Sequence, residues 1–60
     1  MKTEEIIKTF QQNQIKSTEA GIKKRRIDNK LINVIIVANQ EVLKKVQNIP
    51  EFKGIKIETI

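Results

Sequence analysis

The chain has 60 residues, 38% of them hydrophobic, with 12 Lys or Arg and 7 Asp or Glu, so its formal net charge is +5. It contains no Cys, His, Trp or Tyr, which excludes disulfides, thiol or imidazole catalysis and the usual zinc and copper sites. A domain of this size buries only about 60% of the surface of its unfolded chain, and such domains often depend on a disulfide, a metal or a partner subunit. We therefore predict one non-enzymatic domain over residues 1–60, without catalytic residues, metal or cofactor, that forms a homo-oligomer, most simply a dimer.

A first helix is expected over residues 3–15. Thr3 is a suitable N-cap, and two glutamates follow in the first turn, where the positive end of the helix dipole favours carboxylates. Three apolar side chains then recur on one side at helical spacing: Ile6, Ile7 and Phe10. Residues 16–21 are expected to form a connection.

The segment 22–27 (Ile-Lys-Lys-Arg-Arg-Ile) is compatible with a strand or a helix, because its two isoleucines fall on different faces in either conformation. Asp28 and Asn29 follow it, and both residue types tolerate the positive φ of tight hairpin turns. We therefore predict a β-hairpin with strands over residues 22–27 and 30–38. A helix within residues 17–29 is the alternative.

The strand over residues 30–38 is rich in β-branched residues and apolar on both faces, a pattern that requires cover on both faces. A second amphipathic helix is predicted over residues 39–49, with Asn39 as its N-cap and Pro50 as its stop. The last segment, 55–60, alternates between apolar and polar residues and is predicted to be a strand with one buried face.

The order helix, strand, strand, helix, strand predicts a small α+β domain, with a three-stranded sheet and two helices packed on one face. The second and third strands should run parallel through a right-handed crossover. The other sheet face would then expose Leu31, Ile35 and Val37. We expect a second copy to complete the fold there, with Leu31, Asn33, Ile35 and Val37 at the interface. Asn33 would fix the register across that interface, or would simply mark a solvent-exposed point of the strand.

Five cations lie close together in the sequence: Lys23, Lys24, Arg25, Arg26 and Lys30. Arg binds phosphate in a bidentate manner and Lys as a point charge, and a two-stranded ribbon can enter the major groove of DNA. The alternative is a solvated edge strand whose charges prevent aggregation. Lys44 and Lys45 on the second helix would be auxiliary contacts. Both aromatic residues fall at apolar core positions, so stacking on bases is disfavoured.

We predict a small basic regulatory or accessory protein that binds nucleic acid through phosphate contacts as a homo-oligomer. The alternative is a protein-interaction or assembly module, of a phage or mobile-element kind, that uses an apolar sheet face or an edge strand to bind itself or another protein. The net positive charge makes nucleic acid or an acidic protein the expected kind of partner. The N-terminus lacks the pattern of a signal peptide, and the apolar run 34–38 is far shorter than the roughly 20 residues that cross a bilayer. A cytoplasmic location without membrane contact is therefore expected.

Overall fold

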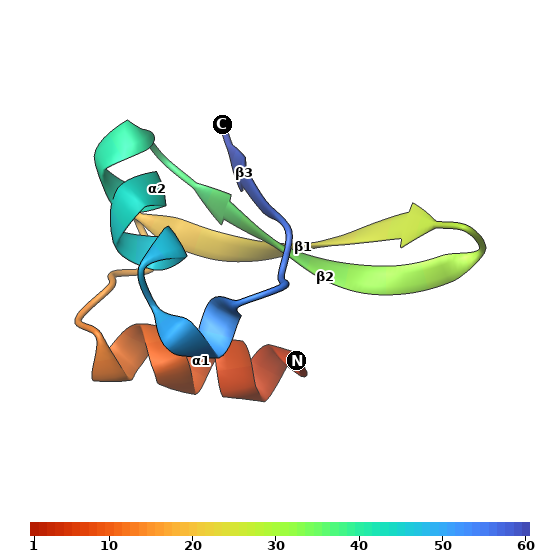
Figure 1. The fold of residues 1–60 in the computed structure, drawn as a ribbon, viewed down its shortest axis with the longest axis horizontal. Coiled ribbons are helices and arrows are strands. Elements are labelled where there is room, and N and C mark those ends of the chain that lie inside the picture. Colours follow the sequence, from red (N-terminus) through yellow and green to blue (C-terminus); the bar gives the residue numbers. More distant parts are fainter.

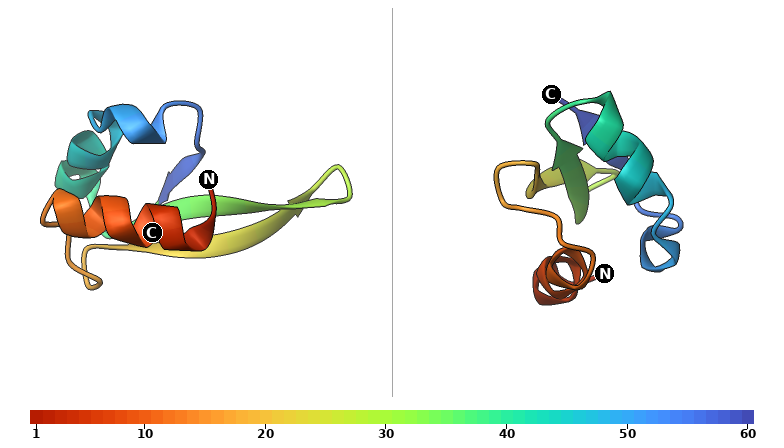
Figure 2. Two further views of the ribbon diagram at one scale, coloured as in Figure 1. Left: turned by 90° about the horizontal axis from the view of Figure 1, so that it is seen from below. Right: turned by 90° about the vertical axis from the view of Figure 1, so that its left-hand side faces the viewer.

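The computed structural model describes residues 1–60 and contains two α-helices, three strands and one short 3-10 helix. In chain order these elements are α1 (Thr3–Gln12), β1 (Ala20–Ile27), β2 (Lys30–Val37), α2 (Gln40–Gln47), η1 (Pro50–Phe52) and β3 (Ile57–Thr59). The sheet order is β1-β2-β3, with β1 antiparallel and β3 parallel to β2. The predicted α+β class is confirmed. The helices gather at one end of the β1–β2 hairpin, and the other end extends beyond them (Figures 1 and 2).

Helix α1 begins at residue 3, as predicted, but its N-cap and its C-terminal end differ from the prediction. Lys2 occupies the N-cap position without a side-chain hydrogen bond, so Thr3 is a helical residue rather than the cap. The helix ends earlier than expected in a Schellman motif, in which Gln14 adopts a left-handed φ of 59° and the Ile15 N–H donates to the carbonyl of Phe10 at 2.9 Å. The motif turns Ile15 back into the core, where it is buried.

The segment 22–27, for which a strand was predicted and a helix was the alternative, is part of strand β1. Asp28 and Asn29 have φ values of 52° and 64°, so the hairpin closes in a two-residue turn of type I′. The register pairs Ile27 with Lys30 at the turn and continues back to Ala20, where β1 begins earlier than expected. The chain reverses here because Asp and Asn tolerate the left-handed backbone conformation that this turn requires.

Helix α2 begins where the sequence predicts. The side-chain oxygen of Asn39 accepts a hydrogen bond from the Val42 N–H at 3.0 Å, which is an N-cap interaction. Helix α2 ends at Gln47, so Pro50 is not the residue that stops it. Pro50 is the first residue of the 3-10 helix η1. This turn carries Phe52 into the core, where its ring meets Phe10 edge to face at a centroid distance of 5.4 Å.

The core lies between the two helices and the sheet face formed by the odd-numbered residues of β2. Ile35 and Val37 are fully buried in it. They pack with apolar side chains of the helices and connections: Ile6, Phe10, Ile15, Val42, Val46, Ile49 and Phe52. The expectation that Ile35 and Val37 form an exposed sheet face is therefore wrong. Both faces of β2 are apolar, so its pattern could not show which face the helices cover.

The opposite sheet face has no helix above it, and an ion pair covers its centre. Arg25 Nη2 lies 2.5 Å from Glu58 Oε1, which links β1 to β3 across β2. Arg25 lies opposite Ile32 in the register. Glu58 lies opposite Ile36, so the ion pair crosses over Val34. Val34 is fully buried although it lies outside the core cluster beneath the helices.

Candidate nucleic-acid interface

Part of the hairpin extends beyond α1 (Figure 1), and its sequence makes it the most basic part of the molecule. We call residues 23–32 the arm. It carries five cations and one carboxylate, Asp28, so four of the five net positive charges of the chain belong to it. The base of the arm is at Asn33, whose Nδ2 donates a hydrogen bond to the carbonyl of Met1 at 3.0 Å. Outside the arm, cations and carboxylates nearly balance.

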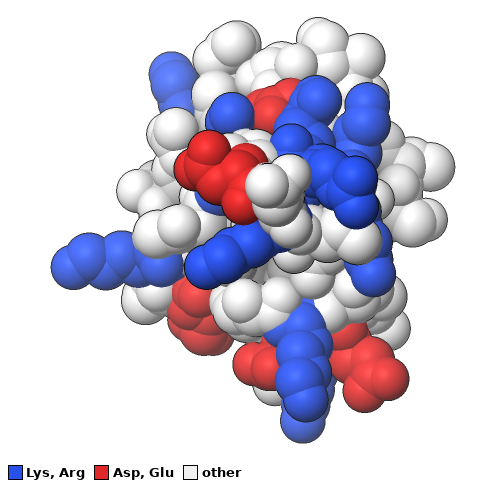
Figure 3. Space-filling view, turned by 90° about the vertical axis from the view of Figure 1, so that its right-hand side faces the viewer, with Lys and Arg blue, Asp and Glu red and all other residues white.

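Strand alternation divides the predicted phosphate-binding residues between the two faces of the arm. Lys23 and Arg25 of β1, with Lys30 of β2, lie on the open sheet face. Lys24 and Arg26 lie on the face that continues from the core. The sequence run is continuous, but its side chains do not form one patch. Figure 3, which faces the tip of the arm, shows Lys and Arg side chains distributed over this end of the molecule with carboxylates among them.

Arg25 is occupied within the sheet. Its side chain is 38% exposed and that of its partner Glu58 is 24% exposed, and Lys56 Nζ lies 3.8 Å from the second carboxylate oxygen. The hydrogen bond from Arg25, helped by the charges of Arg25, Lys56 and Lys23, lowers the pKa of the Glu58 carboxyl against an opposing effect of desolvation. The arm keeps four cations without an ion-pair partner: Lys23, Lys24, Arg26 and Lys30.

The auxiliary cations predicted on the second helix lie away from the arm. Lys44 and Lys45 are exposed in the last turn of α2. Figure 1 shows α2 at one end of the molecule and the tip of the arm at the other. Lys44 and Lys45 therefore do not belong to the basic surface of the arm. Their distance from the arm depends on tertiary packing, which the sequence pattern does not show.

Of the four residues predicted at a subunit interface, two lie in the core, as described above. Leu31 is 66% exposed, on the arm. Asn33 is half-buried, and its amide is used within the chain by the hydrogen bond to Met1. Two further apolar residues of the arm, Ile27 and Ile32, are exposed and were not among the predicted interface residues. Their place on the face opposite Leu31 follows from strand alternation, which was the available signal.

Neither aromatic side chain is near the surface of the arm. Phe10 and Phe52 are both buried and contact each other, so the prediction that they are core residues is confirmed. Stacking on nucleic-acid bases, the usual mode for single strands, has no side chain to perform it on this arm. What the arm offers to a ligand is positive charge, hydrogen-bond donors and three exposed aliphatic side chains.

Neither helix has the length and apolar surface that crossing a membrane requires. The Asp and Glu side chains do not form a group of three or more that could hold a metal ion. Protein-family models, curated proteins and solved structures give no match to this chain.

Proposed function

We propose that the protein is a small regulatory or accessory protein that binds nucleic acid through phosphate contacts of the arm. One observation carries the proposal: four of the five net positive charges are concentrated on a projecting two-stranded arm (Figure 1). Cations on a projection can approach a polyanion while the rest of the domain stays clear of it. Each phosphate neutralised by Lys or Arg releases condensed counterions, and this release drives binding.

A double helix suits the arm better than a single strand. Cations occur on both of its faces, with Lys23 and Lys30 on one and Lys24 and Arg26 on the other. In a groove, phosphates lie on both sides of an inserted element, whereas a flat surface would use only one face. The major groove of B-DNA is about 12 Å wide and admits a two-stranded ribbon. The absence of aromatic side chains on the arm also points away from base stacking.

Salt dependence of duplex binding tests the proposal. If four free cations contact phosphates, log K plotted against log salt should have a slope of about −3.6, measured by fluorescence anisotropy. The double variant Lys24→Gln, Arg26→Gln should reduce the slope by about 2. The matched control Lys44→Gln, Lys45→Gln removes the same charge from α2 and should leave the slope unchanged. Equal effects of the two double variants, or binding that does not respond to salt, would contradict the proposal.

The homo-oligomer remains part of the proposal. Its support is the face of the arm that carries Leu31, whose side chain is 66% exposed and lies on the other side of the arm from Ile27 and Ile32. A second copy would cover this surface and double the number of cations presented to one duplex. Sedimentation at micromolar concentration tests this part separately: we expect a dimer that Leu31→Ser weakens. A monomer would remove the oligomer from the proposal and leave the role of the arm unaffected.

A further inference from the structure

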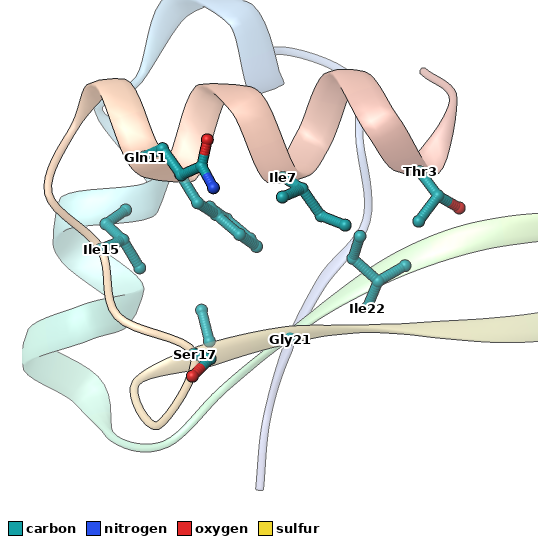
Figure 4. Close-up of a pocket in the computed structure, with 9 residues that line it drawn as sticks. Thr3, Ile7, Gln11, Ile15, Ser17, Gly21 and Ile22 are labelled. Atoms are coloured by element: carbon teal, nitrogen blue, oxygen red, sulfur yellow. The ribbon is translucent and has the colours of Figure 1, made fainter.

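A groove of about 540 Å³ runs between α1 and β1, beside the outer edge of the sheet (Figure 4). Its lining is mostly apolar: Ile7, Phe10, Ile15, Ala20 and Ile22. Figure 4 shows Ile7 of α1 and Ile22 of β1 pointing toward each other across it. Ile7 is 45% exposed although it lies on the sheet side of its helix. The groove is therefore an open apolar surface, separate from the arm.

Helix α1 presents two neighbouring rows of side chains to the rest of the molecule. Ile6 and Phe10 form one row and fill the core. Thr3, Ile7 and Gln11 follow each other at spacings of four residues and form the other row, which lines the groove. The second row is only partly covered, with Ile7 45% exposed, and stands over the outer side of β1 (Figure 4).

The backbone of β1 is free on its outer side. At the start of the hairpin ladder the Ala38 N–H donates to the Glu19 carbonyl at 2.9 Å. Bonded pairs alternate along an antiparallel ladder, so the odd-numbered residues of β1 bond to β2. The residues whose N–H and C=O groups point outward are Ile22, Lys24 and Arg26. An edge of this kind can accept an additional strand.

The charge along this edge selects the occupant. From the groove toward the tip of the arm, the outward-bonding residues change from Ile22 to Lys24 and Arg26. Antiparallel pairing with β1 of a second copy would bring two basic runs together, and like charges directly opposite each other destabilise a sheet. An extended segment with carboxylates at the arm end is complementary instead. We propose that the groove and β1 bind an extended acidic segment of another protein, which adds to the sheet as a fourth strand.

The geometry also specifies the residue pattern of that segment. In an antiparallel addition, its alternate side chains on the helix side meet Arg26, Lys24 and Ile22 in this order. Two carboxylates at alternate positions therefore fit beside Arg26 and Lys24. The apolar side chains that follow them fit into the groove beneath Ile7. The intervening residues point to the other face of the sheet and can be polar.

Synthetic peptides of this pattern test the proposal with the full chain. The test peptide alternates Thr with, in order, Glu, Glu, Ile and Val, and carries a fluorescent label for anisotropy. One control peptide has Lys in place of both Glu residues, and a second has Ser in place of Ile and Val. We expect the controls to bind roughly tenfold more weakly. Equal binding of all three peptides, or no binding of the test peptide at millimolar protein, would overturn the proposal.

Variants of the protein locate the site. Ile7→Ser removes apolar surface from the groove and should weaken peptide binding roughly fivefold. Ile60→Ser is the matched control, because Ile60 is 90% exposed and lies outside the groove. The double variant Lys24→Glu, Arg26→Glu should bind the acidic peptide more weakly and the lysine peptide more tightly than the wild type does. Duplex binding should be unchanged by Ile7→Ser, so the two proposals can be tested separately although both use Lys24 and Arg26.

Amide hydrogen exchange tests the added strand directly. Without peptide, the amides of Ile22, Lys24 and Arg26 should exchange faster than their odd-numbered neighbours. With peptide, these three amides should become protected. Binding without this protection would overturn strand addition. A dimer of the free protein that Ile7→Ser dissociates would show that a second copy fills the groove, and would overturn the acidic partner.

Discussion

Arg25 of β1 and Glu58 of β3 meet across the open face of the sheet, with Nη2 and Oε1 2.5 Å apart above the side chain of Val34. The pair joins the first strand to the last and passes over the central one. Long charged side chains can cover apolar surface with their aliphatic stems while their charged ends remain partly solvated. The two charged residues thus shield the middle of a sheet face that has no second layer.

The same ion pair makes the stability of the protein depend on pH. The pKa of Glu58 is lowered in the folded protein, chiefly by the hydrogen bond from Arg25, so the unfolded chain takes up a proton first as the pH falls. The contribution is present above the usual carboxyl pKa of 4.5 and is lost as the pH falls through the lower folded value. Urea unfolding at pH 7 and pH 3 should show a larger loss of stability for the wild type than for Glu58→Gln. Equal losses would mean that another group controls the acid transition.

Neighbouring cations of β1 should differ in their effect on folding. Arg25→Glu places a carboxylate beside Glu58 and removes the cover of Val34, so it should lower Tm clearly in thermal unfolding followed by circular dichroism. Lys24→Glu makes the same charge change on the other face, where no ion pair exists, and should leave Tm nearly unchanged. Similar Tm values for the two variants would show that the ion pair has no structural role.

The buried face of β2 can be tested with one conservative substitution at two positions. Ile35→Val removes a methylene from a fully buried side chain and should cost about 0.5–1.5 kcal/mol of unfolding free energy. Ile32→Val makes the same change on the open face, where the side chain is exposed, and should cost less than about 0.5 kcal/mol. Urea denaturation measures both. A larger cost at Ile32 would reverse the assignment of the two faces.

Parts of the fold that depend on local chemistry could be predicted from the sequence. The Asp28-Asn29 turn and the Asn39 cap both follow from the hydrogen bonds and dihedral angles that these residue types favour. The face of β2 that is buried could not be predicted, because Ile35 and Val34 offer similar apolar surface on opposite sides. That choice depends on where the helices pack, which no short-range pattern encodes.

The candidate site also has features that the sequence predicts and features that depend on the folded structure. The cations of the arm are evident in the sequence, and alternation already separates Lys23 from Lys24. The engagement of Arg25 could not be predicted, because its partner Glu58 is distant in the sequence and meets it only once the sheet has formed. The groove beside β1 also depends on tertiary structure, since Ile7 and Ile22 face each other only after α1 folds back over the hairpin.

The turn at the tip of the arm should determine how well the arm is ordered. Asn29 has a left-handed φ of 64°, which costs a β-branched residue about 1–2 kcal/mol, so Asn29→Val should destabilise the hairpin by about that amount. Asn29→Gly should be neutral or slightly stabilising, because Asp-Gly is a preferred type I′ pair. Amide exchange along β1 and β2 reports the change where it occurs.

Asn48→Val provides the control for that substitution, because Asn48 is an exposed residue with a φ of −84° that valine also adopts. Its effect on exchange in the hairpin should be negligible. If phosphate binding requires an ordered arm, duplex affinity should fall with Asn29→Val and recover with Asn29→Gly, although neither variant changes a charge. If the duplex affinities of Asn29→Val and Asn29→Gly are equal although the order of the hairpin differs, the cations bind phosphate without an ordered arm.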